Sequence, residues 1–205
     1  MRTDILRKIA LTVTGVAATA GGIAGPAVAA QAQPAAEREL NVRYEAQPNF
    51  YYCGPAAARN ALSVQGKDID MNAMAKEMGT TEAGTNSIND ITPVLNKETG
   101  ENDAYKSVEI RENKADDKQT DKLRADIVRT VDESRAVVAN IAGTSTDTDG
   151  VTHSFEGGHY ISVVGYRDGG KTVTIADSAN PDQASYRISV DNLADWIATR
   201  GYAAS

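Results

Sequence analysis

The last third of the chain carries the pattern that most constrains its fold. β-Branched and aromatic residues dominate the ranges 159–166, 171–177 and 184–190, and glycine or proline separates each range from the next. Such segments are typical of strands. The Asp-Gly-Gly turn at 168–170 is too short for a crossover, so the first two strands must be antiparallel neighbours. The sequence therefore predicts an antiparallel sheet at the C-terminal end.

Helical patterns occupy most of the chain before that sheet. They include an alanine-rich stretch, segments with apolar residues three and four apart, and one strongly amphipathic segment. The predicted helices cover residues 54–63, 70–78, 86–95, 120–133 and 191–199. Further strands are predicted at 107–110 and 135–141, and a polar loop at 143–158. Because helices come first and strands mostly second, the predicted class is α+β, with N-terminal helices packed on a C-terminal antiparallel β-sheet.

Cap residues and one methionine stripe make these helices more specific. Asp70 and Asp191 stand where the second and last helices begin, and each is expected to cap its helix. Met71, Met74 and Met78 are spaced three and four apart. That spacing places all three on one helix face, which we expect to lie in the core.

The polar loop at 143–158 contains residues that resemble a ligand site. Asp147 and Asp149 precede a glycine, as at the start of a calcium-binding loop. The later ligands of such a loop are missing, so a solvated turn is the expected structure. His153 lies in the same polar segment and is expected to be exposed.

Charge and composition exclude several classes of function. The 205 residues carry a formal net charge of −7, which argues against a surface for nucleic acid or for anionic lipid. One cysteine and two histidines allow no internal disulfide and no cysteine-rich metal centre. We therefore expect no metal and no cofactor. The candidates for chemistry are one thiol and two imidazoles.

Residues 1–30 have the pattern of a secretory signal peptide. Arg2, Arg7 and Lys8 precede an uncharged stretch that ends in small residues, and cleavage is expected near Ala29 or Ala30. A retained membrane anchor is the alternative, but the stretch has few large apolar residues. Residues 31–39 then form a flexible N-terminal segment and residues 40–205 the folded domain. We expect a secreted protein with no membrane contact after cleavage.

Cys53 lies immediately before the alanine-rich helix. The positive end of a helix dipole favours thiolate over thiol at such a position, and a thiolate is a ready nucleophile. Cleavage of an amide also needs an imidazole to protonate the leaving amine, and an acceptor to orient that imidazole. A buried, unreactive cysteine or an intermolecular disulfide is the alternative.

The first predicted hairpin brings a histidine and an aspartate together. His159 and Ile161 share one face of their strand, and Ile175 and Asp177 share one face of the next. A three-residue turn places Ile161 opposite Asp177, so His159 and Asp177 become diagonal neighbours on one face. Asn180 falls on the other face, and Asp177 is therefore the preferred orienting group. A buried histidine that only satisfies a carboxylate is the alternative.

The segment before Cys53 adds polar and aromatic candidates. Gln47 lies six residues upstream, and its amide is placed to stabilise a developing oxyanion together with the Cys53 backbone N–H. Phe50, Tyr51 and Tyr52 either line a substrate cleft or pack against the sheet.

Together these segments resemble the papain-like cysteine peptidases, and the most similar branch is the bacteriocin-processing, double-glycine leader peptidases (family 39 of clan CA). The resemblance rests on the segments Gln47-x5-Cys53-Gly54-Pro55-Ala56, Gly158-His159-Tyr160-Ile161-Ser162-Val163-Val164-Gly165-Tyr166 and Ile175-Ala176-Asp177. It implies a papain-like fold and a peptide or protein substrate. It also implies Cys53 as nucleophile, His159 as general acid/base, Asp177 as orienting group and Gln47 in the oxyanion hole.

Three functions are compatible with these residues. The leading hypothesis is a secreted cysteine peptidase that hydrolyses peptide bonds through an acyl-enzyme on Cys53. An amidase, a cell-wall peptide hydrolase or an acyl transferase would apply the same thiol chemistry to another substrate. A catalytically silent binding module would retain the fold without turnover. The sequence leaves the natural substrate and the oligomeric state open.

Overall fold

The strands within residues 36–205 form one antiparallel sheet. The computed structural model describes residues 36–205, so the predicted signal peptide, residues 1–30, lies outside the described residues. The strands are β1 (Arg38–Glu39), β2 (Lys106–Glu109), β3 (Val137–Thr146), β4 (Thr152–Arg167), β5 (Thr172–Ala176), β6 (Ser185–Ser189) and β7 (Gly201–Ala204). They are ordered β2-β7-β3-β4-β5-β6, and β1 pairs with β4.

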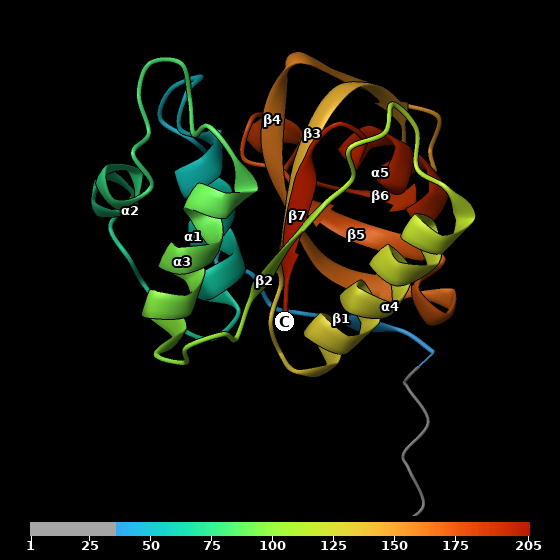
Figure 1. The fold of residues 1–205 in the computed structure, drawn as a ribbon, viewed down its shortest axis with the longest axis horizontal. Coiled ribbons are helices and arrows are strands. Elements are labelled where there is room, and N and C mark those ends of the chain that lie inside the picture. The colour runs from blue at the N-terminus through green and yellow to red at the C-terminus, as the bar shows by residue number, and fades with distance from the viewer. Residues whose placement is uncertain (1–35) are drawn as a thin grey trace, which may run out of the picture. The chain divides into compact units, whose positions relative to one another are not determined.

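Helices cover both faces of this sheet (Figure 1). They are α1 (Cys53–Ser63), α2 (Met71–Glu77), α3 (Ile88–Thr99), α4 (Asp117–Asp132) and α5 (Val190–Ile197), with short 3-10 segments at Asp168–Gly170 and Pro181–Gln183. α1, α2 and α3 pack on one face, and α4 and α5 on the other. The α+β class and the packing of N-terminal helices on an antiparallel sheet are confirmed. No helix within residues 36–205 combines the length and apolar character needed to cross a bilayer.

β4 divides its side chains between two hydrophobic cores. Tyr160 and Val164 are buried against α1–α3, whereas Ile161 and Val163 are buried in the core with α4 and α5. This alternation is what the period of a strand requires, and each large side chain so buried contributes about 1.5–3 kcal/mol to folding. The central strand therefore holds the two helical layers together.

The hairpin between β3 and β4 is longer than the sequence predicts. The range 143–158, expected to be a polar loop, is mostly paired: Gly143 lies opposite Phe155, and Thr146 lies opposite Thr152. The turn itself is short and is closed by the hydrogen bond from Asp147 N–H to the Val151 carbonyl (2.9 Å). The segment looks polar because one of its faces is exposed, where Thr144 and Ser154 bond each other across the ladder.

His153 is buried, contrary to the predicted exposure. Its ring stacks on Tyr186 with centroids 3.9 Å apart, and its Nε2 lies 3.0 Å from Oδ2 of Asp147. Oδ1 of Asp147 accepts the backbone N–H groups of Asp149 and Val151, each at 2.9 Å. Protein donors therefore occupy the carboxylate that resembled a calcium ligand, and the described residues contain no cluster suited to a metal ion.

The register between β4 and β5 follows from two features that compensate each other. Arg167 pairs with Thr172, so the loop has one residue more than the predicted three-residue turn. A bulge between Val163 and Gly165 removes that offset, and Ser162 pairs with Ala176. The predicted register around Ile161 and Asp177 is therefore kept.

Several helices begin or end at other residues than predicted, because the residues that cap them differ from the expected ones. α3 continues past Pro93, which removes a single backbone donor, and ends before Gly100 at φ +78°. α4 begins three residues earlier than predicted, capped by Asp116. Ser189, and not Asp191, caps α5. Asp70 does cap α2, and Met71, Met74 and Met78 are buried as predicted.

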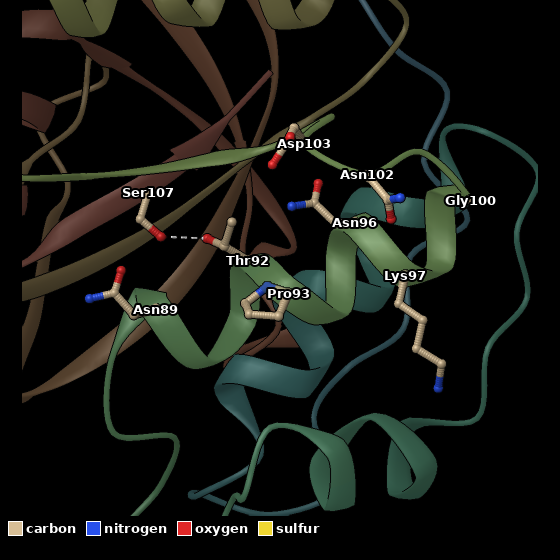
Figure 2. Close-up of a pocket in the computed structure, with 9 residues that line it drawn as sticks. All are labelled: Asn89, Thr92, Pro93, Asn96, Lys97, Gly100, Asn102, Asp103 and Ser107. Atoms are coloured by element: carbon tan, nitrogen blue, oxygen red, sulfur yellow. Dashed lines mark hydrogen bonds between the residues drawn. The ribbon is translucent and has the colours of Figure 1, made fainter.

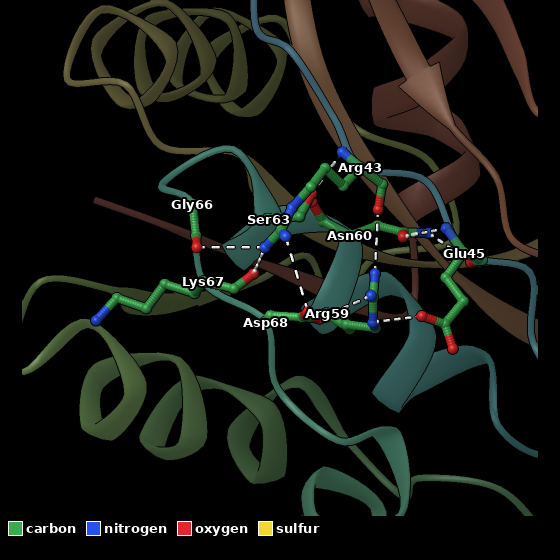
Figure 3. Close-up of polar contacts among 8 residues, drawn as sticks. All are labelled: Arg43, Glu45, Arg59, Asn60, Ser63, Gly66, Lys67 and Asp68. Carbon is green, nitrogen blue, oxygen red and sulfur yellow. Dashed lines mark hydrogen bonds and ion pairs between the residues drawn. The ribbon is translucent and has the colours of Figure 1, made fainter.

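The N-terminal segment is fastened to α1 by polar contacts (Figure 3). The Asn60 amide bonds both the N–H and the carbonyl of Glu45, at 2.9 and 3.0 Å. Ser63 accepts the N–H of Arg43, and Arg59 pairs with the Glu45 carboxylate at 2.7 Å. The sequence assigned residues 31–39 to a flexible segment, but β1 within that range pairs with β4. The ordered domain therefore begins before residue 40.

Candidate active site

Cys53 is the first residue of α1 and is buried. Burial raises the pKa of its thiol, but hydrogen bonds from His159, Tyr160 N–H and Gly54 N–H, with the charge of His159, outweigh that effect. The pKa therefore lies below the ordinary value of a cysteine. A lowered pKa increases the thiolate fraction near neutral pH, which is the form that acts as a nucleophile.

His159 lies between Cys53 and Asp177. Its Nε2 is 2.7 Å from Oδ1 of Asp177, which leaves Nδ1 for the contact with the thiol. Phe155 stacks on the imidazole, with centroids 4.1 Å apart and planes 17° apart. Burial lowers the pKa of His159, but Asp177 and Cys53 together raise it to about 9. The arrangement therefore favours a thiolate–imidazolium pair over two neutral groups.

Asp177 follows the end of β5 and accepts three hydrogen bonds. Besides His159, the N–H of Ala179 donates to Oδ1 at 2.9 Å and the hydroxyl of Tyr186 donates to Oδ2 at 3.0 Å. Burial raises the pKa of Asp177, but these donors and the charge of His159 hold it below the usual range. The Asn180 side chain instead accepts the N–H of Asp182. The structure thus joins Asp177 to the imidazole, as the strand parity predicts.

Tyr186 is a site residue that sequence reasoning missed. It lies on β6 opposite Ile175, and this register brings its hydroxyl to the carboxylate that follows β5. Its ring stacks on the imidazole of His153. Ala184 and Ile188, two positions away on either side, suggest only a core-facing position, and the pairing of β5 with β6 decides which carboxylate Tyr186 meets.

Gln47 is held beside Asp177 rather than bonded to Cys53. Its backbone N–H donates to the carbonyl of Ser178 at 3.0 Å, and the hydroxyl of Ser178 donates to its Oε1 at 3.0 Å. Its Nε2 donates to the carbonyl of Asn49 at 2.9 Å. A side-chain amide has two N–H groups, so one donor is left for another acceptor.

A cleft of about 340 Å³ includes Cys53 in its wall. Phe50 and Tyr51 form one side of it, their rings edge to face, and Phe50 is 80% exposed. Phe50 and Tyr51 therefore line the cleft. Tyr52 is not part of its wall, and its hydroxyl donates to the Asn72 side chain. Gly158, next to His159, lies on the cleft wall as well.

A larger cavity, of about 680 Å³, lies along α3 and contains none of these residues (Figure 2). Thr92 and Ser107 in its wall bond each other at 2.7 Å. The Asn96 amide is engaged by the backbone of Tyr105 in both directions. Because Thr92, Ser107 and Asn96 already bond within the protein and neither the cysteine nor a histidine lines this cavity, we place the chemistry at the smaller cleft.

Comparisons with solved structures agree with this architecture. The comparison with curated proteins gave no match. A C39-like peptidase from Bacillus anthracis has a TM-score of 0.54 at 12% identity, over 80% of this chain and 94% of that one. The peptidase domain of Streptococcus ComA, a bi-functional ABC transporter involved in a quorum-sensing pathway, has a TM-score of 0.52 at 15% identity, over 80% and 98%. At such identities these structures share the fold.

The family follows from the sequence comparison. The profile of the Peptidase C39-like family matches residues 39–204, which include nearly all of the described range. The chain therefore belongs to the Peptidase C39-like family and is a cysteine-type peptidase.

Proposed function

We propose that the protein is a secreted peptidase that hydrolyses peptide bonds with Cys53, His159 and Asp177 as its catalytic group. One observation carries the proposal: a continuous set of hydrogen bonds runs from the Cys53 thiol through His159 to Asp177. All three side chains are buried, so water screens their interactions little, and Cys53 lines the cleft.

The proposed reaction proceeds through an acyl-enzyme. The Cys53 thiolate attacks the carbonyl carbon of the substrate, and the negative charge moves to the carbonyl oxygen. The backbone N–H at the start of α1 and the Gln47 amide stabilise that oxygen. The imidazolium of His159 gives its proton to the leaving amine, and the C–N bond breaks. His159 then takes a proton from water, the hydroxide attacks the thioester, and the acid leaves as the thiolate re-forms.

Alkylation of the thiol tests the proposed nucleophile. Folded protein is treated with iodoacetamide across a range of pH, and the adduct is located by mass spectrometry. We expect Cys53 to react at pH values where a thiol of the unfolded protein reacts slowly, because its pKa is lowered. An adduct that forms no faster in folded than in unfolded protein would contradict the proposal.

A peptide library separates the alternatives. The wild-type protein and Cys53→Ala are compared on the library, on simple amides and on peptidoglycan. Cleavage of peptides by the wild type alone supports a peptidase. Release of amino groups only from peptidoglycan indicates a cell-wall hydrolase, and binding without turnover in both forms indicates a silent module.

Secretion is a separate part of the proposal and rests on residues 1–30. Expression of the full chain in a Gram-positive host, followed by N-terminal sequencing of protein from the medium, tests it. We expect the mature chain to begin just after Ala29 or Ala30. Full-length protein that stays with the cells would contradict secretion.

A further inference from the structure

Arg200 lines the same cleft as Cys53 but takes no part in the proposed reaction. It lies between α5 and β7, and its guanidinium reaches Gly158, the neighbour of His159. A Cβ built on Gly158 would lie 3.4 Å from Nη2 of Arg200. The cleft also shares Asn86, Asn140 and Arg200 with an adjoining cavity of about 210 Å³, so the guanidinium lies where the two meet.

The guanidinium has no anionic partner within the described protein. Every other arginine of residues 36–205 lies within 4.0 Å of a carboxylate. No hydrogen bond or ion pair within the same residues involves the Arg200 side chain, and its Nε is buried without an acceptor. Arg135 and Arg187 also have an unpaired buried Nε, but each pairs with a glutamate through a terminal nitrogen.

The backbone holds this arginine in one place. Thr199 has φ +67°, a strained conformation for a β-branched residue. Hydrogen bonds fix the turn on both sides: Thr199 N–H donates to the Glu112 carbonyl, and Ile110 N–H donates to the Arg200 carbonyl, each at 3.0 Å. Such a strained and fastened turn positions the base of the side chain before any ligand arrives.

Charge in the cleft favours an anionic partner at this point. Arg200 is the one arginine or lysine that lines it, and Glu82, which is exposed, is the one carboxylate. Glu82 and Arg200 form no ion pair. A fork of N–H donors without an acceptor matches the geometry of a carboxylate, which can accept two of them at once.

We infer that Arg200 is a specificity-determining residue that binds a carboxylate of the peptide substrate. The inference rests on the proposed role of the Cys53 cleft in peptide hydrolysis. The carboxylate belongs either to an acidic side chain near the cleaved bond or to the C-terminus of the peptide, and the chemistry of binding is the same for both.

Peptide binding to a catalytically inactive form tests the inference without turnover. Cys53→Ala is dialysed against pools of N-acetylated hexapeptides in which each position in turn holds Glu or Gln. Each pool is made as the C-terminal acid and as the amide, and bound peptides are quantified by mass spectrometry. We expect about tenfold enrichment of the carboxylate-bearing member of a pair, the size of a charge-assisted hydrogen bond.

Variants in the same background assign the preference to Arg200. Arg200→Gln should abolish the enrichment, Arg200→Lys should retain part of it, and Glu82→Gln should leave it intact. Enrichment by Glu at one position identifies a side chain as the ligand, and enrichment by the free acid identifies the C-terminus. Equal binding of the paired peptides by Cys53→Ala, or a preference that survives Arg200→Gln, would overturn the inference. A wild-type protein that cuts no peptide would instead refute the proposed function.

Discussion

The carboxylate of Asp177 accepts hydrogen bonds from two groups besides the His159 imidazole. His159 and Ala179 N–H donate to one oxygen, and the Tyr186 hydroxyl donates to the other. An anion held by three donors keeps its charge and its orientation, so His159 meets a fixed acceptor. Tyr186 touches Asp177 and not the thiol, so we regard it as a positioning residue.

Replacing this tyrosine should therefore weaken catalysis without removing it. Tyr186→Phe keeps the stack on His153 but loses the donor to Asp177. We expect kcat/KM to fall roughly two- to tenfold, the effect of one net hydrogen bond. The pKa of Asp177 should rise, because an anion loses a donor, and its protonation should then add to that of Cys53 and move the acid limb of the pH–rate profile to higher pH.

Tyr202→Phe provides the matched control, because its hydroxyl donates to the buried carboxylate of Asp126 at 2.8 Å, away from the cleft. Both variants should lose about 1 kcal/mol of stability. A pH–rate profile that is unchanged in Tyr186→Phe, or moved equally in Tyr202→Phe, would contradict the positioning role.

The pKa values of Cys53 and His159 predict a bell-shaped pH dependence of kcat/KM. The acid limb should lie below the ordinary pKa of a thiol, and the alkaline limb should lie near pH 9, where His159 loses its proton. The folded-state pKa of His159 is raised from 6.5. Its contribution to the free energy of unfolding is therefore complete below pH 6.5 and is lost as pH rises through about 9.

Kinetic and denaturant measurements from pH 4 to pH 10 check both statements. In Cys53→Ala the His159 pKa should fall, because the thiol is one of the groups that raise it, and NMR titration of the imidazole would report the change. An alkaline limb at the ordinary pKa of histidine would show that the pair does not form.

At the scale of elements, β1 pairs with β4 directly beside the bulge. Glu39 of β1 pairs with Gly165, next to the bulge that restores the register of His159 and Asp177. A Cβ on Gly165 would lie 2.8 Å from the carbonyl oxygen of Arg38, closer than van der Waals contact allows. A side chain at this position is therefore incompatible with the observed strand.

Gly165→Ala should displace β1 and lower the free energy of unfolding by about 1–3 kcal/mol, measured in urea. Gly157→Ala on the same strand is the control, because its Cβ would meet no atom within 4 Å. We expect a change of less than about 0.5 kcal/mol there. Equal losses in the two variants would show that the contact with Arg38 is not the cause.

At the scale of the whole molecule, the N-terminal segment ties the helical layer to the cleft. Asn60 on α1 is buried and bonds both polar groups of the Glu45 backbone, and Gln47 follows two residues later beside Ser178. The segment thus connects α1, whose first residue is Cys53, to the end of β5, which Asp177 follows.

Asn60→Ala should lower the free energy of unfolding by about 2–3 kcal/mol, since two backbone groups lose their partners. Asn89→Ala on α3 is the control, because its amide bonds an exposed glutamate. Its effect should stay within about 0.5 kcal/mol. Denaturant curves of the two variants check this, and similar losses in both would refute the structural role of the Asn60 amide.

Local pattern determined much of the fold and the candidate site. Helices, strands, the α+β class and the buried methionines follow from spacings of two, three and four residues, which depend only on backbone geometry. The parity of β4 and β5 likewise indicated that His159 and Asp177 share one face, and the structure joins them. That result survived an incorrect loop length because the bulge in β4 compensated for the extra loop residue.

The sequence by itself thus determined which residues face the core and that a thiol starts a helix. Only the tertiary structure decided which distant groups meet those residues: Tyr186 on Asp177, Ser178 on Gln47, His153 inside the hairpin, and Arg200 in the cleft. Some of these contacts, such as that of Ser178 with Gln47, join segments that are far apart in the chain. Others, such as that of His153 with Asp147, lie in a hairpin whose sequence is polar, so no apolar pattern marks its buried face. Their pairing follows from the packing of strands and helices, on which local periodicity carries no information.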